Sequence, residues 1–266
     1  MSHIEQIKFL EITAKFLKLN NNKKLKILDV GSADYNGSSR KIFKSKKYIG
    51  ADILKAPGVD LIVKPGSKLP FTKEEFDVVL SCNCFEHNPF WEKSFSEMYR
   101  VLKDTKFFIL SVPSRGRVEH GTSRTWKGNL VNETKYQYFK KNFDYYKNLL
   151  ESDFYKAYDI KNMFKLFFFY YYPRTKDLFF VGIKSQQPNN KKSEIQLDKL
   201  LNKIKNIDTF LPQPKTKTPN ILRKLFVLTD LPMRVLSLFL SDKNYQKFAI
   251  PYYNFRDKLY FFFKKF

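Results

Sequence analysis

The chain has 266 residues, of which 49 are basic and 26 acidic, so its formal net charge is +23. This length accommodates one α/β domain with a sizeable core and roughly eighty residues more. The two cysteines, Cys82 and Cys84, are separated by one residue, which excludes a disulfide framework and predicts a reducing, cytoplasmic compartment. No metal site is predicted, and no apolar run is long enough for a transmembrane helix.

The positive charge indicates one of three partners, namely nucleic acid, an anionic membrane surface or an acidic substrate. A bias of composition towards lysine explains the same excess without any partner. The charge is not confined to one part of the chain, because residues 186–266 hold 16 basic and six acidic side chains. An RNA-recognition module is not evident, so nucleic acid is the less favoured partner.

In chain order, residues 1–19 have the pattern of an amphipathic helix without the apolar core of a signal peptide. Residues 26–37, KILDVGSADYNG, then form a short apolar run that is broken at Gly31. This pattern predicts a buried parallel strand and a tight turn, and residues 38–46 are expected to form the helix that follows. Nucleotide-like cofactors bind at such turns in doubly wound sheets.

The acidic residues at this turn indicate which kind of cofactor it can bind. A dinucleotide site has three glycines that admit a pyrophosphate, whereas this turn has one glycine with Asp29 and Asp34 beside it. Two carboxylates repel phosphate and suit a cationic ligand such as an aminoacyl-sulfonium. The turn therefore favours a positively charged nucleoside.

Four further strands are predicted after the turn, over residues 48–53, 58–63, 76–81 and 107–112. The first of them ends at Asp52, about twenty residues after the turn, where an acid can bind both ribose hydroxyls.

The turn, together with the segments LPF, FDVVLS, FEH and EMYRVLK, resembles the class I S-adenosylmethionine (SAM)-dependent methyltransferases, and most closely the methyltransferase type 11 group. The resemblance covers roughly residues 24–185. It implies a SAM-dependent methyltransferase with a Rossmann-like α/β fold, a doubly wound seven-stranded sheet of order 3-2-1-4-5-7-6. The implied cofactor residues are Asp29, Gly31, Ser32, Ala33, Asp52, Ile53, Ser81 and Asn83. Alanine and tyrosine stand where the family's second and third glycines are expected, so a non-catalytic SAM-binding protein is an alternative.

Candidates for a general base are His87, His120 and Glu86, because a hydroxyl acceptor must lose a proton. The Glu86–His87 pair is equally suited to starting a helix. Residues 113–127 follow the fifth strand and should lie over the methyl group of the cofactor. In this loop Arg115, His120, Arg124 and Trp126 are candidate substrate contacts, and the arginines, Arg117 included, suit an anionic or hydroxyl-rich acceptor.

Later in the chain, residues 133–150 have helical spacing, and residues 163–172 and 177–184 are expected to form the β-hairpin that closes the sheet. We place a domain boundary in the polar stretch that follows, which divides the chain into a methyltransferase domain, residues 1–185, and a basic, aromatic-rich helical extension, residues 186–266. The extension could lie on an anionic bilayer, pack on the catalytic domain, form a dimer contact or cover the substrate mouth.

The function predicted from the sequence is methyl transfer to a small molecule or a glycan, such as a surface polysaccharide or its lipid-linked precursor. Peripheral contact with the inner face of the membrane through the extension is one of the possibilities that the sequence leaves open. The alternatives are an RNA methyltransferase and a non-catalytic SAM-binding or membrane-docking protein.

Overall fold

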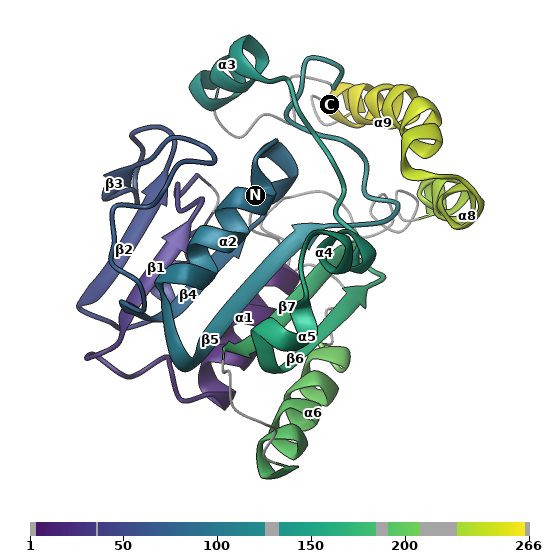
Figure 1. Ribbon diagram of the computed structural model, residues 1–266. Coiled ribbons are helices and arrows are strands. Elements are labelled where there is room, and N and C mark those ends of the chain that lie inside the picture. The colour runs from purple at the N-terminus through teal and green to yellow at the C-terminus, as the bar shows by residue number, and fades with distance from the viewer. Residues whose placement is uncertain (1–3, 36, 126–132, 185–190, 208–227, 264–266) are drawn as a thin grey trace.

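A computed structural model describes residues 4–35, 37–125, 133–184, 191–207 and 228–263. Its centre is one seven-stranded sheet of order β3-β2-β1-β4-β5-β7-β6, which confirms the predicted order (Figure 1). The strands are β1 (Lys26–Val30), β2 (Lys47–Asp52), β3 (Leu61–Ile62), β4 (Phe76–Cys82), β5 (Leu102–Pro113), β6 (Phe164–Tyr172) and β7 (Asp177–Lys184).

The central strands are parallel, and the last pair reverses the direction of the sheet. β1 pairs in parallel with β2 and with β4, whereas β7 runs antiparallel to both of its neighbours, β5 and β6. The register places Asp177, the first residue of β7, opposite Pro113, the last residue of β5. The turn between β6 and β7 therefore lies at the same edge as the carboxyl ends of β1 and β4.

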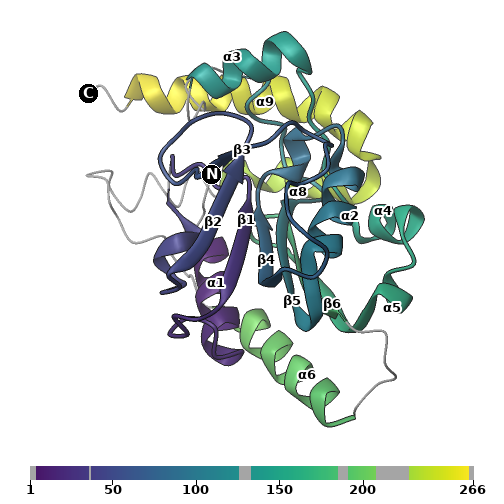
Figure 2. The ribbon, with the colours of Figure 1, turned by 60° about the vertical axis from the view of Figure 1, so that its left-hand side comes forward.

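Helices cover both faces of the sheet, as expected of a doubly wound fold (Figures 1 and 2). One face packs against α2, whose Trp91, Phe95 and Met98 follow one another at helical spacing, and against α4 and α5. The other face packs against α1 and α6. The described helices are α1 (Ile4–Phe16), α2 (Trp91–Val101), α3 (Glu133–Asn142), α4 (Glu151–Ala157), α5 (Ile160–Met163), α6 (Lys191–Lys205), α8 (Leu231–Phe239) and α9 (Asp242–Phe263).

Aromatic rings fill much of this core. Phe9 of α1 stacks on Phe179 of β7 with ring centroids 4.2 Å apart, and both side chains are fully buried. On the opposite face, Phe95, Phe108 and Phe180 form a cluster of tilted and edge-on contacts. Such pairs add about 0.5–1.5 kcal/mol each beyond the burial of their area.

The helix expected over residues 38–46 is wrong, because only a single 3₁₀ turn, η1 (Ser39–Lys41), forms there. Backbone groups of this segment bind elsewhere. The Lys44 amide donates to the carbonyl of Asn20, and the hydroxyl of Ser45 donates to the carbonyl of Leu25. These bonds tie the segment to the chain before β1 and prevent a continuous helix.

The helix expected over residues 133–150 is too long, since α3 ends at Asn142. Beyond it, Asp144 adopts a left-handed conformation with φ of 43°. Its carboxylate accepts hydrogen bonds from the amide and hydroxyl of Ser123 and pairs with Arg124 at 3.2 Å. The chain is thereby bound to the loop after β5 and runs on without helical structure to Leu150.

The C-terminal helices α8 and α9 lie beyond the carboxyl edge of the sheet (Figures 1 and 2). Arg115 donates to the carbonyls of Ser237 and Leu238 at 3.0 and 2.9 Å. Gln246 of α9 donates to the carbonyl of Arg117 at 2.7 Å. These bonds fix both helices onto the loop after β5. The predicted boundary between residues 185 and 186 lies outside the described residues, so the domain division stays a prediction.

Candidate active site

The turn after β1 is shaped by Gly31, whose φ is +88°. A Cβ at this position would lie 2.4 Å from the Cβ of Cys84, so only glycine fits. The amides of Gly31 and Ser32 donate to the carbonyl of Ala51 at 2.8 and 3.2 Å. The turn is therefore held against the end of β2, as expected from the sequence motif.

Asp52 is the last residue of β2, and it links that strand to the turn. Its carboxylate accepts hydrogen bonds from the amides of Ala33, at 3.1 Å, and of Ile53, at 2.7 Å. The side chain is 4% exposed and faces a cavity of about 660 Å³, measured to its open mouth.

This cavity, the turn pocket, collects residues from the ends of β1, β2 and β4, from the segment after β3 and from α2. Its apolar walls include Val30, Ile53, Val63 and Leu69. Its polar groups include Gly31, Asp52, Lys64, Ser67, Asn83, His87, Asn88, Ser94 and Glu97. Of the eight residues expected to bind the cofactor, four line the pocket, namely Gly31, Asp52, Ile53 and Asn83.

Two of the other expected residues are directed into the sheet. The Asp29 carboxylate is 3% exposed and accepts a hydrogen bond from the hydroxyl of Tyr48 at 2.6 Å. Burial raises the pKa of Asp29 to about 7, while the Tyr48 hydrogen bond opposes the rise and the nearby Asp52 adds to it. The hydroxyl of Ser81 donates to the carbonyl of Val30 at 2.7 Å. Both side chains support the strands from which the pocket is built.

Ser32 and Ala33 hold the turn through different groups. The Ser32 hydroxyl donates to the carbonyl of Gly58 at 3.2 Å, and the Ala33 amide donates to Asp52. Gly50 of β2 makes this approach possible, because a Cβ there would lie 2.1 Å from the Gly58 carbonyl oxygen and 2.5 Å from the Ser32 hydroxyl. The backbone of the turn thus sets the position of Asp52.

The three base candidates lie close to one another, and one of them, His87, lines the turn pocket. Glu86 and His87 lie in the 3₁₀ turn η2 (Phe85–His87), and His120 comes from the loop after β5. The rings of His87 and His120 meet edge to face with centroids 5.3 Å apart, and Tyr146 contacts both rings, at 5.4 and 5.0 Å. The sequence did not indicate Tyr146, because no motif surrounds it.

Burial perturbs two of these groups. It lowers the pKa of His120 well below its usual value, and the neighbouring His87 lowers it further. It also raises the pKa of Glu86 to about 7, and both carboxylate oxygens lack a hydrogen-bond partner among the described residues. The ligand atoms of Glu86, His87 and His120 all lie within 4.8 Å of one another, so this is also the combination of groups to which a divalent metal ion could bind.

The two arginines expected to contact substrate, Arg115 and Arg124, bind other parts of the protein instead. Arg115 holds α8, as described above, and Arg124 pairs with Glu119 at 2.6 Å and with Asp144. Trp126, the remaining substrate candidate, lies outside the described residues. Arg117 does line a cavity, together with residues that the sequence did not indicate. Those residues come from the β6–β7 turn, from Asp230 next to α8, and from α8 and α9: Arg174, Thr175, Lys176, Asp230, Arg234, Tyr253 and Arg256.

The comparisons with known proteins agree with this geometry. Residues 17–110 match the family model of the methyltransferase domain. No curated protein matches the chain. Among solved structures, a putative methyltransferase from Bacillus halodurans is 21% identical, with 59% of this chain and 68% of that chain covered and a TM-score of 0.38.

A second solved structure is a SAM-dependent methyltransferase from Thermotoga maritima, described as a possible histamine N-methyltransferase. It is 17% identical, with 68% of this chain and 91% of that chain covered and a TM-score of 0.42. The family match spans β1 to β4, most of β5 and the residues of the turn pocket. It confirms the resemblance predicted from the sequence, because residues 17–110 are similar to a methyltransferase domain and lie in a sheet of the predicted order.

Proposed function

We propose that this protein transfers a methyl group from S-adenosylmethionine, bound in the turn pocket, to a small-molecule or glycan acceptor. The observation that carries the proposal is the buried carboxylate of Asp52 at the end of β2, facing a pocket with apolar walls. A second acid, Glu97, also lines the pocket but is paired with Arg100 at 2.7 Å, and one cation, Lys64, lines the pocket as well. The buried carboxylate of Asp52 and the apolar walls fit a cationic nucleoside better than a pyrophosphate.

The proposed roles follow from the positions of the residues. Asp52 accepts hydrogen bonds from the two ribose hydroxyls, and Ile53 and Leu69 pack against the base. The backbone at Gly31 and the side chain of Asn83 contact the aminoacyl end. Asp29, Ser32, Ala33 and Ser81 act through the strands and the turn that they hold.

When bound, S-adenosylmethionine supplies an electrophilic methyl group. The protein must then hold the acceptor close to that group, exclude water and take up the acceptor's proton. His120 suits the last task, because its Nδ1 faces the carbonyl of Val118 at 3.3 Å and its Nε2 is left as the basic atom. Its low pKa keeps it neutral near pH 7 and also makes it a weaker proton acceptor than a free imidazole. His87, which lines the turn pocket, contacts its ring.

Membrane contact is part of the proposal, and exposed apolar side chains on the C-terminal helices support it. Phe239 is 79% exposed and Phe255 65%. Other exposed apolar residues of α8 and α9 are Leu231, Val235, Leu238, Phe248 and Leu259. Among the described residues, no helix is long and apolar enough to cross a membrane. Flotation of the full chain with anionic vesicles should fall when Phe239→Asp and Phe255→Asp are combined, and unchanged flotation would reject the contact.

Titration with S-adenosylhomocysteine by calorimetry tests the cofactor site. The wild-type protein should bind, and Asp52→Asn should weaken binding about 10- to 100-fold, since hydrogen bonds to a charged group are worth about 1.5–3 kcal/mol. Asp104→Asn is the control, because it removes the same charge from an exposed position after α2. Absence of heat with the wild-type protein would exclude the enzyme function.

Binding and methyl-transfer measurements also distinguish the two remaining alternatives, a non-catalytic SAM-binding protein and an RNA methyltransferase. A non-catalytic SAM-binding protein would bind S-adenosylhomocysteine and show no methyl transfer to any fraction of cellular metabolites, glycans or RNA. An RNA methyltransferase would label RNA with methyl groups, and its RNA affinity would fall steeply with salt.

A further inference from the structure

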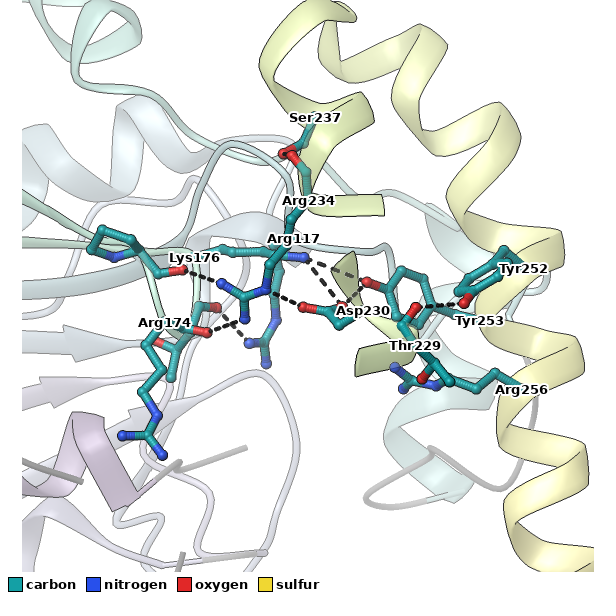
Figure 3. A network of polar contacts seen from close by, with 12 residues as sticks. Arg117, Arg174, Lys176, Thr229, Asp230, Arg234, Ser237, Tyr252, Tyr253 and Arg256 are labelled. Atoms are coloured by element: carbon teal, nitrogen blue, oxygen red, sulfur yellow. Dashed lines mark hydrogen bonds and ion pairs between the residues drawn. The ribbon is translucent and has the colours of Figure 1, made fainter. Parts of the chain in front are cut away.

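A second cavity lies next to the base candidates, between the loop after β5, the β6–β7 turn and the C-terminal helices. Its volume is about 830 Å³, measured to its open mouth. Five of its ten lining residues carry a positive charge and one carries a negative charge (Figure 3). We call this cavity the cationic pocket. Its charged residues are Arg117, Arg174, Lys176, Arg234, Arg256 and Asp230.

Asp230, the one acidic residue among the described residues that line the pocket, interacts with several side chains. Arg234 pairs with Asp230 at 2.5 Å, and Lys176 approaches the same carboxylate at 3.6 Å. The hydroxyl of Tyr253 donates to it as well. One carboxylate therefore faces two cations inside the pocket, and the positive charge of the lining is not balanced (Figure 3).

The other arginines do not restore the balance within the pocket. Arg117 donates to the carbonyl of Thr175 at 2.7 Å, and its charge also acts on the buried carboxylates of Asp177 and Glu86, which do not line the pocket. Arg174 lies 3.7 Å from Glu5, and Arg256 lies 2.9 Å from Asp257, but neither acid lines the pocket.

Lys176 is buried among these charges, and 7% of the residue is exposed. Burial lowers the pKa of Lys176 to about 8, and the charges of Arg234 and Arg117 lower it further, while Asp230 opposes them. Like charges kept this close repel one another. Arg234 also anchors α8 to the β6–β7 turn, because it donates to the carbonyls of Pro173 and Arg174 at 3.2 and 3.1 Å.

We propose that the cationic pocket binds a phosphate, or a group of the same charge, on the methyl acceptor. Arginine and lysine side chains from several segments of the chain converge there, and guanidinium groups match the geometry of phosphate oxygens. With about 300 Å³ of space open to water, the pocket lies at the lower end of the range for small-molecule sites and has room for a phosphorylated sugar or headgroup.

The location relative to the cofactor site gives the pocket its role as an acceptor site, and this part rests on the proposed function. His120 lines the cationic pocket, and His87 lines the turn pocket. Their rings are in edge-to-face contact, with centroids 5.3 Å apart. A phosphate bound by the arginines would therefore leave the rest of the acceptor beside the proposed base and near the bound cofactor.

Calorimetry of the full chain with inorganic phosphate and with a hexose 1-phosphate tests the site directly. We expect the hexose 1-phosphate to bind more tightly, and Arg174→Gln and Arg256→Gln each to weaken both ligands about tenfold. Lys247→Gln is the matched control, because it removes one charge from an exposed position of the same helix as Arg256 and should leave both affinities unchanged. Equal losses in the control, or no loss in the pocket variants, would overturn the proposal.

Two further measurements define the ligand and separate this proposal from the proposed function. Binding to vesicles that contain phosphatidic acid is compared with binding to vesicles of phosphatidylcholine alone. Binding that requires phosphatidic acid and is lost in Arg174→Gln and Arg256→Gln would identify the ligand as a lipid phosphate and not a soluble one. Tighter binding of a short RNA through the same residues would instead identify a nucleic-acid site and overturn the acceptor assignment. S-adenosylhomocysteine should bind Arg174→Gln and Arg256→Gln as it binds the wild type, so a failure of the cofactor site would leave the phosphate result standing.

Discussion

Replacement of Asp29 by Asn should make the fold less sensitive to alkaline pH. The carboxyl group is buried, and its pKa is raised from 3.8 to about 7. A group whose pKa is raised by folding contributes stability below its unfolded pKa and loses it as the pH rises through the folded pKa. One pKa unit corresponds to about 1.4 kcal/mol, so the whole contribution of Asp29 is about 4 kcal/mol.

Part of this contribution is already lost at pH 5, since the unfolded carboxyl is mostly ionised there. Between pH 5 and pH 8 the wild type should lose about 2.5 kcal/mol of its free energy of unfolding through Asp29. The Asp29→Asn variant should not show this loss. From pH 5 to pH 8, the melting temperature of the wild type should therefore fall by about 5–10 °C more than that of Asp29→Asn. Urea unfolding at both pH values, with wild type and variant measured in parallel, gives the same quantity as free energies.

Asp77→Asn is the control for this experiment. Although burial opposes it, hydrogen bonds from the Lys26 amide and from Lys103 hold the pKa of Asp77 below its usual value. Its contribution is lost only as the pH falls below about 4, so this variant should keep the wild-type change between pH 5 and pH 8. If Asp29→Asn lost as much stability as the wild type over this range, the carboxyl would not be buried as described.

Three other changes test separate parts of the structure. Gly31→Ala should cost about 1–3 kcal/mol and weaken S-adenosylhomocysteine binding, because the added Cβ meets Cys84, and melting curves together with calorimetry measure both effects. Arg115→Gln should free α8 from the loop after β5, which hydrogen exchange would report as faster exchange over residues 231–239 with unchanged exchange in β4. Phe179→Ala should destabilise the protein by about 3–5 kcal/mol in urea unfolding, and a cost below about 1 kcal/mol would show that α1 does not pack on β7 as described.

The sequence predicts the sheet well because its signals are local. Apolar runs mark the strands, the turn glycine follows β1, and Asp52 ends β2 at the expected spacing. The sheet order came from the resemblance, and the structure confirms it. The helix expected over residues 38–46 fails for the opposite reason, since distant carbonyls of Asn20 and Leu25 decide the conformation.

The candidate site is predicted only in part, because side-chain direction depends on partners far away in the chain. Arg115 and Arg117 look equivalent in sequence, yet one anchors α8 and the other lines the cationic pocket. Arg174 and Lys176 carried no motif. The expected order β5-β7-β6 nevertheless implies that their turn lies beside Pro113, so the signal existed at the level of topology.

The two pockets are built from different parts of the chain. The residues that line the turn pocket all lie within residues 17–110, the part that is similar to a methyltransferase domain. The cationic pocket is built after residue 110, from the loop after β5, the hairpin turn and the C-terminal helices. Arg234 and Arg256 lie in the predicted extension and Arg117 in the predicted domain, so neither part alone forms the pocket. Because the proposed acceptor site is formed by segments outside the family match, the identity of the acceptor should be sought in that pocket and not in the fold.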